Sequence, residues 1–247
     1  MNSSIHRRGV TLWGATLLLA VLAATAAPCA FAATGSGHPV SEARQVSDFQ
    51  AISAFGPIKL VVRQAAREAL ELRADDNLLP LIETTVEAGT LRIAPKRGEN
   101  LNTRTPIIAT IDVVNLKSLL LSGSGDVLVD TLKTPALSLI LSGSSDARLR
   151  GLATDELGVK VSGSGNVEAA GSAARLKISV SGSGDARTRE LTSDDVTISI
   201  AGSGSANVTA NKTLSVSIAG SGDVVFGGTG ALVKSSIAGS GSVKQRQ

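Results

Sequence analysis

Apolar and polar residues alternate in the second half of the chain, within short segments that recur at a nearly constant interval. Each segment has an aliphatic residue at every second position, mostly separated by Ser, Lys, Gly or Thr. The aliphatic sets are Leu137, Leu139 and Leu141; Leu157, Val159 and Val161; Leu176, Ile178 and Val180; Val196, Ile198 and Ile200; and Leu214, Val216 and Ile218. An alternation of period two, rich in β-branched residues, predicts strands with one buried face.

A short phrase built on Gly-Ser-Gly follows each of these segments. Its seven copies recur at a nearly constant spacing, which is typical of solenoids. Glycine permits the positive φ of a sharp turn, and one serine per coil predicts a ladder of hydroxyls that bond along the stack or to turn amides. The residues to which we assign this structural turn role are Gly123, Gly143, Gly163, Gly182, Gly202, Gly220, Gly239, Ser124, Ser144, Ser164, Ser183, Ser203, Ser221 and Ser240.

The alternation resumes more weakly after each turn, for example at Val127 and Val129 and at Val224 and Phe226. Each repeat therefore contains a strand, a tight turn, a second strand and a variable polar loop. Equivalent strands of successive repeats would stack in parallel about 4.8 Å apart. This pattern predicts an all-β protein, a parallel β-helix with coils of about 20 residues and aliphatic side chains stacked inside.

The first half of the chain is less regular. Strands are expected at 58–62 and 107–114, a hairpin at 84–93 around Gly89, and a turn into a short helical piece after Asp75. At 65–72, helix propensity competes with an alternating pattern.

The domain organisation follows from these patterns. We interpret residues 43–115 as irregular opening coils and residues 116–247 as seven regular repeats. Together they form a single β-helix domain, residues 43–247, because no long linker divides the two halves. Residues 33–42 are expected to be a flexible linker.

The segment 1–32 resembles a secretory signal peptide. An apolar run from Val10 to Ala27 follows Arg7 and Arg8, and Ala30-Phe31-Ala32 is a suitable cleavage site. The alternative is an uncleaved anchor, because the run approaches the length of a spanning helix. We expect an exported protein that is periplasmic, associated with the outer surface or secreted, with no stable membrane span after cleavage.

Cleavage leads to a testable prediction. The exported protein should begin near Ala33 and absorb almost no light at 280 nm, because Trp13 is removed and the chain has no Tyr. The intact mass of the exported protein measures this directly. A mass that still includes residues 1–32 would contradict the prediction.

Cleavage also changes the charge. The processed chain runs from Ala33 to Gln247, and its net charge falls from +3 to +1 because Arg7 and Arg8 leave. No single-sign field remains to attract nucleic acid or anionic lipid. Cys29 leaves as well, so no disulfide can stabilise the processed chain.

Acidic residues recur directly after the turns, at Asp126, Asp146, Asp185 and Asp223, with Asn166 at the equivalent position. A file of carboxylates can bind Ca²⁺. The alternative is that each side chain accepts hydrogen bonds from its own turn, and Ser205 and Ser242 dilute the file in the remaining coils. We assign no metal ligand and no cofactor.

Few residues are candidates for catalysis. Asp75 with Asp76, and Asp194 with Asp195, are adjacent pairs, but two carboxylates cleave glycosides only when they face one cleft. Solvated loop acids are the simpler interpretation. His38 lies in a Gly/Ser-rich start without a partner, and the turn serines have no base nearby. We therefore assign no catalytic residue.

Four further motifs, with the Gly-Ser-Gly turns, resemble the head GIN domain family of auto-transporter adhesins of bacterial envelopes. The resemblance covers about residues 43–245, and the motifs are Phe49-Gln-Ala-Ile52, Val61-Val-Arg-Gln64, Ala74-Asp-Asp-Asn-Leu-Leu-Pro-Leu-Ile82 and Val86-Glu-Ala-Gly-Thr-Leu-Arg-Ile93. It implies a right-handed parallel β-helix similar to pectin lyases, without a retained catalytic set. It also implies a role in adhesion.

Three classes of function remain. The first is a non-enzymatic envelope or secreted protein that binds cell-surface components, a glycan or another copy of itself through many weak contacts along one face, for example at Arg148, Lys160, Lys177 and Arg187. The second is a carbohydrate-active enzyme, although the processed chain has no Trp or Tyr to stack on sugar rings. The third is an inert periplasmic scaffold.

Overall fold

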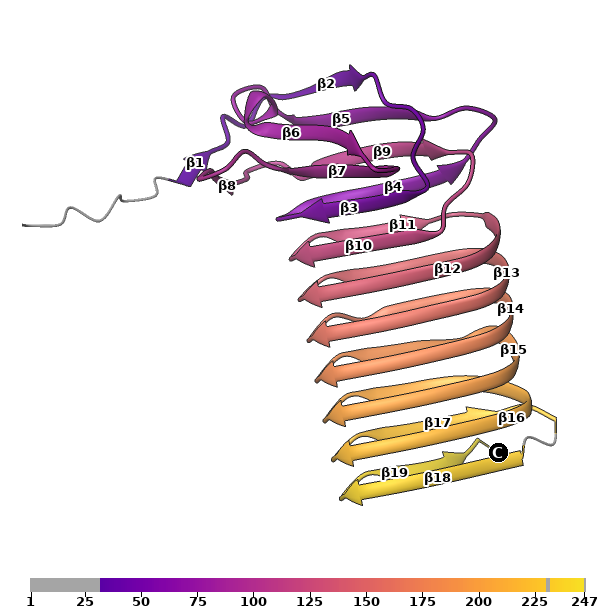
Figure 1. Ribbon diagram of the computed structural model, residues 1–247. Helices are drawn as coiled ribbons and strands as arrows, with labels where there is room; N and C mark the ends of the chain where they lie inside the picture. Colours follow the sequence, from indigo (N-terminus) through magenta and orange to yellow (C-terminus); the bar gives the residue numbers. More distant parts are fainter. Residues whose placement is uncertain (1–31, 230–231, 247) are drawn as a thin grey trace, which may run out of the picture.

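The computed structural model describes residues 32–229 and 232–246, which are almost entirely β-structure (Figure 1). The predicted signal peptide, apart from Ala32, lies outside this part. The elements are β1 (Ala32–Thr34), β2 (Pro39–Arg44), β3 (Ala51–Phe55), β4 (Ile58–Gln64), β5 (Ala69–Asp75), the 3-10 helix η1 (Leu79–Leu81), β6 (Ile82–Glu87), β7 (Thr90–Pro95), β8 (Asn100–Asn102), β9 (Ile107–Val113), β10 (Ser118–Gly123), β11 (Asp126–Val129), β12 (Leu132–Gly143), β13 (Asp146–Gly163), β14 (Val167–Gly182), β15 (Asp185–Gly202), β16 (Ser205–Gly220), β17 (Asp223–Gly227), β18 (Leu232–Gly239) and β19 (Ser242–Gln245). Among these residues, no helix is long and apolar enough to cross a membrane.

Strands β10 to β19 form a parallel solenoid below an N-terminal cap (Figure 1). Successive turn glycines face one another in an unbroken register from Gly123 to Gly239. The prediction of an all-β parallel β-helix with coils of about 20 residues is therefore confirmed.

Each coil has two walls that meet at the turn. We call the segments that run into the turns, such as 157–163, the entry wall, and the segments that leave them, such as 146–149, the exit wall. Alternate side chains of both walls are buried, as predicted: Val159 and Val161 on the entry wall, and Ala147 and Leu149 on the exit wall, are each at most 2% exposed. The remaining side chains of each wall point outward.

The turns are linked by backbone rather than by hydroxyls. The first glycine of each copy has a φ between 101° and 135°, which L side chains rarely adopt. From the second copy onward, the next serine donates its backbone N–H to a glycine carbonyl of the preceding coil, as Ser164 does to Gly143 at 2.9 Å. The side chains of these serines are exposed. The stack therefore rests on a ladder of main-chain bonds, and the serine side chains form an outer edge.

The variable polar loop predicted within each repeat is wrong for most coils. Strands β13, β14, β15 and β16 run without a break from one turn to the next, and their central parts also pair in parallel, for example Ala153 with Ser172. The central parts of these strands contain polar residues because every second side chain points to solvent, and the backbone stays within the sheet.

The cap continues both walls upward and ends each of them with antiparallel strands. Strands β3 and β4 stack on β10 and β11 as a further coil, and β7 and β9 stack on β3 and β4, all in parallel. Above them, β6 pairs with β7, β5 with β9, and β2 with β5, all antiparallel. The interpretation of residues 43–115 as opening coils is wrong for β5 and β6, which pair antiparallel.

The predicted hairpin around Gly89 is confirmed as β6 and β7, and the helical piece after Asp75 as η1. The competing patterns at 65–72 resolve as a strand in β5. The linker predicted at 33–42 is wrong, because Pro39–Arg44 forms β2 and β1 pairs with β8. Main-chain pairing holds this Gly/Ser-rich stretch although it buries little apolar surface.

The side chain of Arg44 bridges the gap between the two antiparallel edges at the top of the cap. It projects from β2, and its guanidinium donates to the carbonyls of Ile82 at 2.6 Å and Leu79 at 3.1 Å, and to Thr84 Oγ1 at 2.9 Å. The carbonyls of Ile82 in β6 and Leu79 in η1 thereby gain a donor that no further strand supplies. One continuous hydrophobic core runs from Phe49 in the cap to Phe226 near the other end.

Candidate functional site

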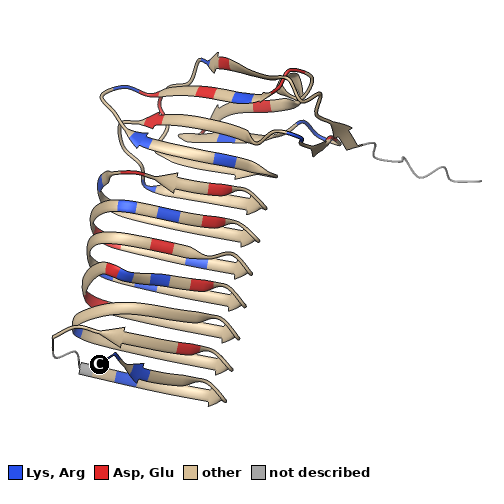
Figure 2. Cartoon of the chain, turned by 180° about the vertical axis from the view of Figure 1, so that it is seen from behind, with Lys and Arg blue, Asp and Glu red and all other residues tan. Residues whose placement is uncertain are grey.

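An open hollow of about 440 Å³ lies on the exit wall, over strands β13, β14 and β15. Four arginines against two glutamates leave it with a net charge of +2. Charged residues also gather along the coils on the side of the molecule that Figure 2 presents. We call this depression on the exit wall the arginine hollow. Its lining consists of Arg148, Leu149, Arg150, Glu168, Ala169, Ala170, Arg187, Arg189, Glu190 and Asn207.

The hollow forms because β14 is one residue shorter than both neighbours at this place. Leu149 pairs with Ala169, and the next pair in register is Leu152 with Gly171, so Ala170 of β14 faces both Arg150 and Gly151 of β13. On the other side, Ala169 faces both Thr188 and Arg189 of β15. A bulged strand bends locally, so the longer coils flank a floor formed by Ala169 and Ala170.

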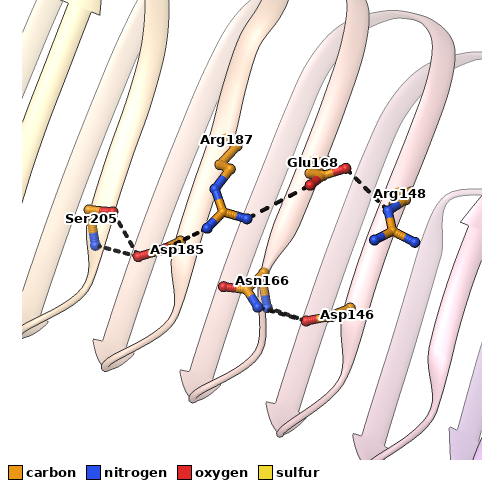
Figure 3. Close-up of polar contacts among 7 residues, drawn as sticks. All are labelled: Asp146, Arg148, Asn166, Glu168, Asp185, Arg187 and Ser205. Atoms are coloured by element: carbon orange, nitrogen blue, oxygen red, sulfur yellow. Dashed lines mark hydrogen bonds and ion pairs between the residues drawn. The ribbon is translucent and has the colours of Figure 1, made fainter.

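A ladder of ion pairs crosses the hollow (Figure 3). Arg148, Glu168 and Arg187 occupy one register position in three successive coils. Arg148 Nε lies 3.2 Å from Glu168 Oε2, and Arg187 Nη1 lies 3.8 Å from Glu168 Oε1. Arg187 also donates to Asp185 at 2.9 Å. Glu168 therefore shares its charge between two arginines.

These arginines are accessible to a ligand. The side chains of Arg148 and Arg187 are 57% and 55% exposed, and exposed ion pairs contribute at most about 1 kcal/mol. In Figure 3 the contact with Glu168 uses Nε of Arg148, and the two terminal nitrogens lie on the other side of the group. A guanidinium presents a planar fork of donors that matches carboxylate, sulfate or phosphate.

The acidic file after the turns lies beside the hollow, and its hydrogen bonds run to the following coil. Asp146 Oδ1 accepts from the backbone N and from Nδ2 of Asn166, both at 2.9 Å. Asp185 accepts from Ser205 Oγ at 2.7 Å (Figure 3). The expectation that the carboxylates bind their own turns is wrong for Asp146, Asp185 and Asp223, since the neutral residue of the next coil supplies the donor. In the described part of the chain, no group of three or more His, Cys, Asp or Glu residues could hold a metal ion.

The four cations proposed for one binding face lie on two walls. Arg148 and Arg187 belong to the exit wall, whereas Lys160 pairs in register with Ile140 and Ser179 of the entry wall. Lys177 also belongs to the entry wall. The prediction of a single face is wrong because the tight turn reverses the chain between the two sets.

Asp75 and Asp76 in the cap differ in burial, so the expectation that both are solvated loop acids is wrong for Asp75. Asp75 is fully buried, its Oδ1 accepts a hydrogen bond from Thr105, and its Oδ2 lies against Gly35 with no hydrogen-bond partner among the described residues. Asp76 is exposed and accepts from Ser36 Oγ at 2.5 Å and from the backbone N of Asn77 at 2.7 Å. The structure thus brings His38 close to Asp76, through Ser36, although the sequence pointed to no partner.

This contact predicts a local pH dependence. The hydrogen bond from Ser36, then that from Asn77 and the charge of His38, hold the pKa of Asp76 below its ordinary value of 3.8. A lowered folded-state pKa means that the contact stabilises the fold above about pH 3.8 and is lost as the pH falls through the lowered pKa. The amide chemical shift of Asn77 should report this titration. Asp76→Asn should abolish it, and an unchanged titration in that variant would contradict the assignment.

The second acidic pair lies in β15, several coils below the cap (Figure 1). Asp194 contacts Lys212 Nζ at 2.9 Å, and Asp195 accepts from Thr213 Oγ1 at 2.6 Å. Both carboxylates therefore link adjacent coils. Since β15 and the cap are separated by several coils, Asp194 and Asp195 do not share a cleft with Asp75 or Asp76.

Sequence reasoning missed four of the six charged residues that line the hollow, namely Arg150, Glu168, Arg189 and Glu190. Two signals could have found it. The phrase Arg-x-Arg occurs at Arg148 to Arg150 and again at Arg187 to Arg189, and the coil between them is one residue shorter than the coils on either side. Together they mark a depression with arginines on both sides.

Solved structures share this architecture. A "putative adhesin" from Bacteroides fragilis NCTC 9343 superimposes with a TM-score of 0.80 at 22% identity, over 87% of this chain and 100% of that one. A "putative adhesin" from Parabacteroides merdae ATCC 43184 has a TM-score of 0.71 at 22% identity, over 87% and 99%. A "putative lipid binding protein" from Parabacteroides distasonis ATCC 8503 has a TM-score of 0.75 at 27% identity, over 88% and 100%.

The family comparison agrees with the resemblance seen in the motifs. No curated protein matches the chain. The model of the family described as "Putative auto-transporter adhesin, head GIN domain" matches residues 48–230, which include most of the cap and the solenoid as far as β17. The chain therefore belongs to the head GIN domain family of auto-transporter adhesins.

Proposed function

We propose that this protein is a non-enzymatic adhesin of the cell envelope that binds surface components through the exit wall. The observation that carries the proposal is the arginine hollow, where exposed cations stand on a rigid stack of main-chain bonds. Family membership supports the same role. The proposal includes export, with the protein displayed on the surface, released or kept in the periplasm.

The arrangement of titratable groups supports binding rather than catalysis. The acids and the histidine first considered as catalytic lie in two places, at Asp75, Asp76 and His38 in the cap and at Asp194 and Asp195 in β15. Glycoside hydrolysis requires two carboxyl groups that flank one bond. A β-helix by itself does not imply an enzyme. Incubation with polysaccharides should therefore release no new reducing ends.

Adhesion can be tested with beads that carry the processed chain. We expect such beads to attach to cells or to extracted envelope polymers, and soluble chain to compete with them. Beads coated with a protein of similar size and charge are the control. Attachment equal to that of the control would favour an inert scaffold and overturn the proposal.

A further inference from the structure

The arginine hollow has a geometry that selects among ligands. Two Arg-x-Arg pairs, Arg148 with Arg150 and Arg187 with Arg189, stand on the coils that flank the short one. The members of a pair are about 7 Å apart along their strand, and the pairs are roughly 10 Å apart across two strand spacings. Four donor forks at such distances suit a ligand with several anionic groups rather than a single small ion.

The lining of the hollow disfavours ligands that need stacking. Its residues are arginine, glutamate, alanine, leucine and asparagine, with no aromatic ring. Single-stranded nucleic acids gain much of their affinity from aromatic platforms. Anionic groups on a flexible polymer instead gain charge-assisted hydrogen bonds from guanidinium forks.

Glu168 occupies the place that a ligand anion would take. It lies between Arg148 and Arg187 and contacts both, and its own side chain is 47% exposed. Because such a pair is weak, a ligand carboxylate or sulfate can replace it at small cost. The basic surface continues beyond the hollow, since Arg246 donates to Asn207 Oδ1 at 3.2 Å.

We infer that the arginine hollow binds an anionic polysaccharide whose carboxylate or sulfate groups contact Arg148, Arg150, Arg187 and Arg189. The polymer runs along the solenoid axis, across the floor of Ala169 and Ala170 and on toward Arg246. The inference rests on the proposed function, in which the exit wall is the binding face, and adds the chemical class of the ligand.

The test measures binding of the processed full chain to immobilised polymers by biolayer interferometry. Dextran sulfate and polygalacturonate provide sulfate and carboxylate, and neutral dextran is the control polymer. We expect binding to both anionic polymers, weakening with salt, and none to neutral dextran. Equal binding to neutral dextran would overturn the inference. Single-stranded DNA and phosphatidylglycerol vesicles are compared with the anionic polymers at the same concentration of negative charge, and tighter binding to either would also overturn it.

Two pairs of variants locate the site. Arg148→Gln with Arg187→Gln should weaken binding about tenfold or more, whereas Lys160→Gln with Lys177→Gln removes the same charge from the entry wall and should change it less than about twofold. The second comparison concerns the glutamate that lies between the two arginines. Glu168→Gln should tighten binding about threefold, because it removes the carboxylate that competes with the ligand. Glu156→Gln, which breaks an exposed pair with Arg175 away from the hollow, should not. If a variant in the hollow and its control changed binding equally in either comparison, the assignment would be overturned.

The outcome separates the inference from the proposed function. If the beads attach to cells but the chain binds neither anionic polymer, the ligand assignment fails and adhesion stands. If the chain binds anionic polymers at the hollow but the beads do not attach, the site stands and adhesion fails.

Discussion

Replacing Gly163 with Val is expected to lower the free energy of unfolding by about 3–5 kcal/mol. Gly163 has a φ of 125°, a conformation that a β-branched residue adopts only with strain. A Cβ at this position would also overlap the carbonyl oxygen of Gly143 in the preceding coil. That carbonyl already accepts the N–H of Ser164 in the turn ladder, so it cannot move away without breaking a main-chain bond.

The matched control is Gly158→Val in the same coil. A Cβ at Gly158 would meet nothing closer than the carbonyl oxygen of Leu137, at 4.0 Å, and valine suits a partly exposed strand position better than glycine does. The midpoint of urea unfolding, followed by far-UV circular dichroism, should therefore stay the same or rise in this variant. Equal losses in the two variants would show that the turn does not require glycine.

The regular part of the fold could be predicted because one physical requirement sets it. Parallel coils must repeat the same backbone path, so the aliphatic alternation and the turn glycines recur together, and the register from Gly123 to Gly239 follows from their spacing. The coil formed by β3 and β4 escaped the pattern because its turn is Phe55-Gly56-Pro57 rather than the repeated phrase. Gly56 nevertheless takes a φ of 93° beside Gly123.

The antiparallel edges of the cap and the arginine hollow could not be predicted in the same way. An alternating segment such as β5 fits a parallel or an antiparallel neighbour equally well, and its partners β2 and β9 lie far from it in sequence. The hollow depends on a one-residue difference in coil length, which the turn spacings contain but which the alternation of apolar and polar residues does not reveal. Burial of Asp75 depends on the approach of Gly35, a contact between separate segments.

Replacing Arg44 with Ala is expected to lower the free energy of unfolding by about 2–4 kcal/mol and to loosen the top of the cap first. The side chain is only 16% exposed, and it supplies charged donors to the carbonyls of Ile82 and Leu79 and to Thr84. Without it, acceptors at the edge of β6 lose their partners. Hydrogen exchange of the β2 and β6 amides should accelerate before exchange in the solenoid changes, since local opening costs less than global unfolding.

Arg63→Ala provides the matched control for this loss. Arg63 lies in β4, one of the parallel strands below the antiparallel edges, and makes a single 3.0 Å contact with Asp112, with its side chain 55% exposed. Losing such a pair should cost less than about 1 kcal/mol and leave amide exchange in β6 unchanged. If Arg44→Ala and Arg63→Ala shifted the urea midpoint equally, Arg44 would be one more surface cation. The two edges of the cap would then be held together by the core alone.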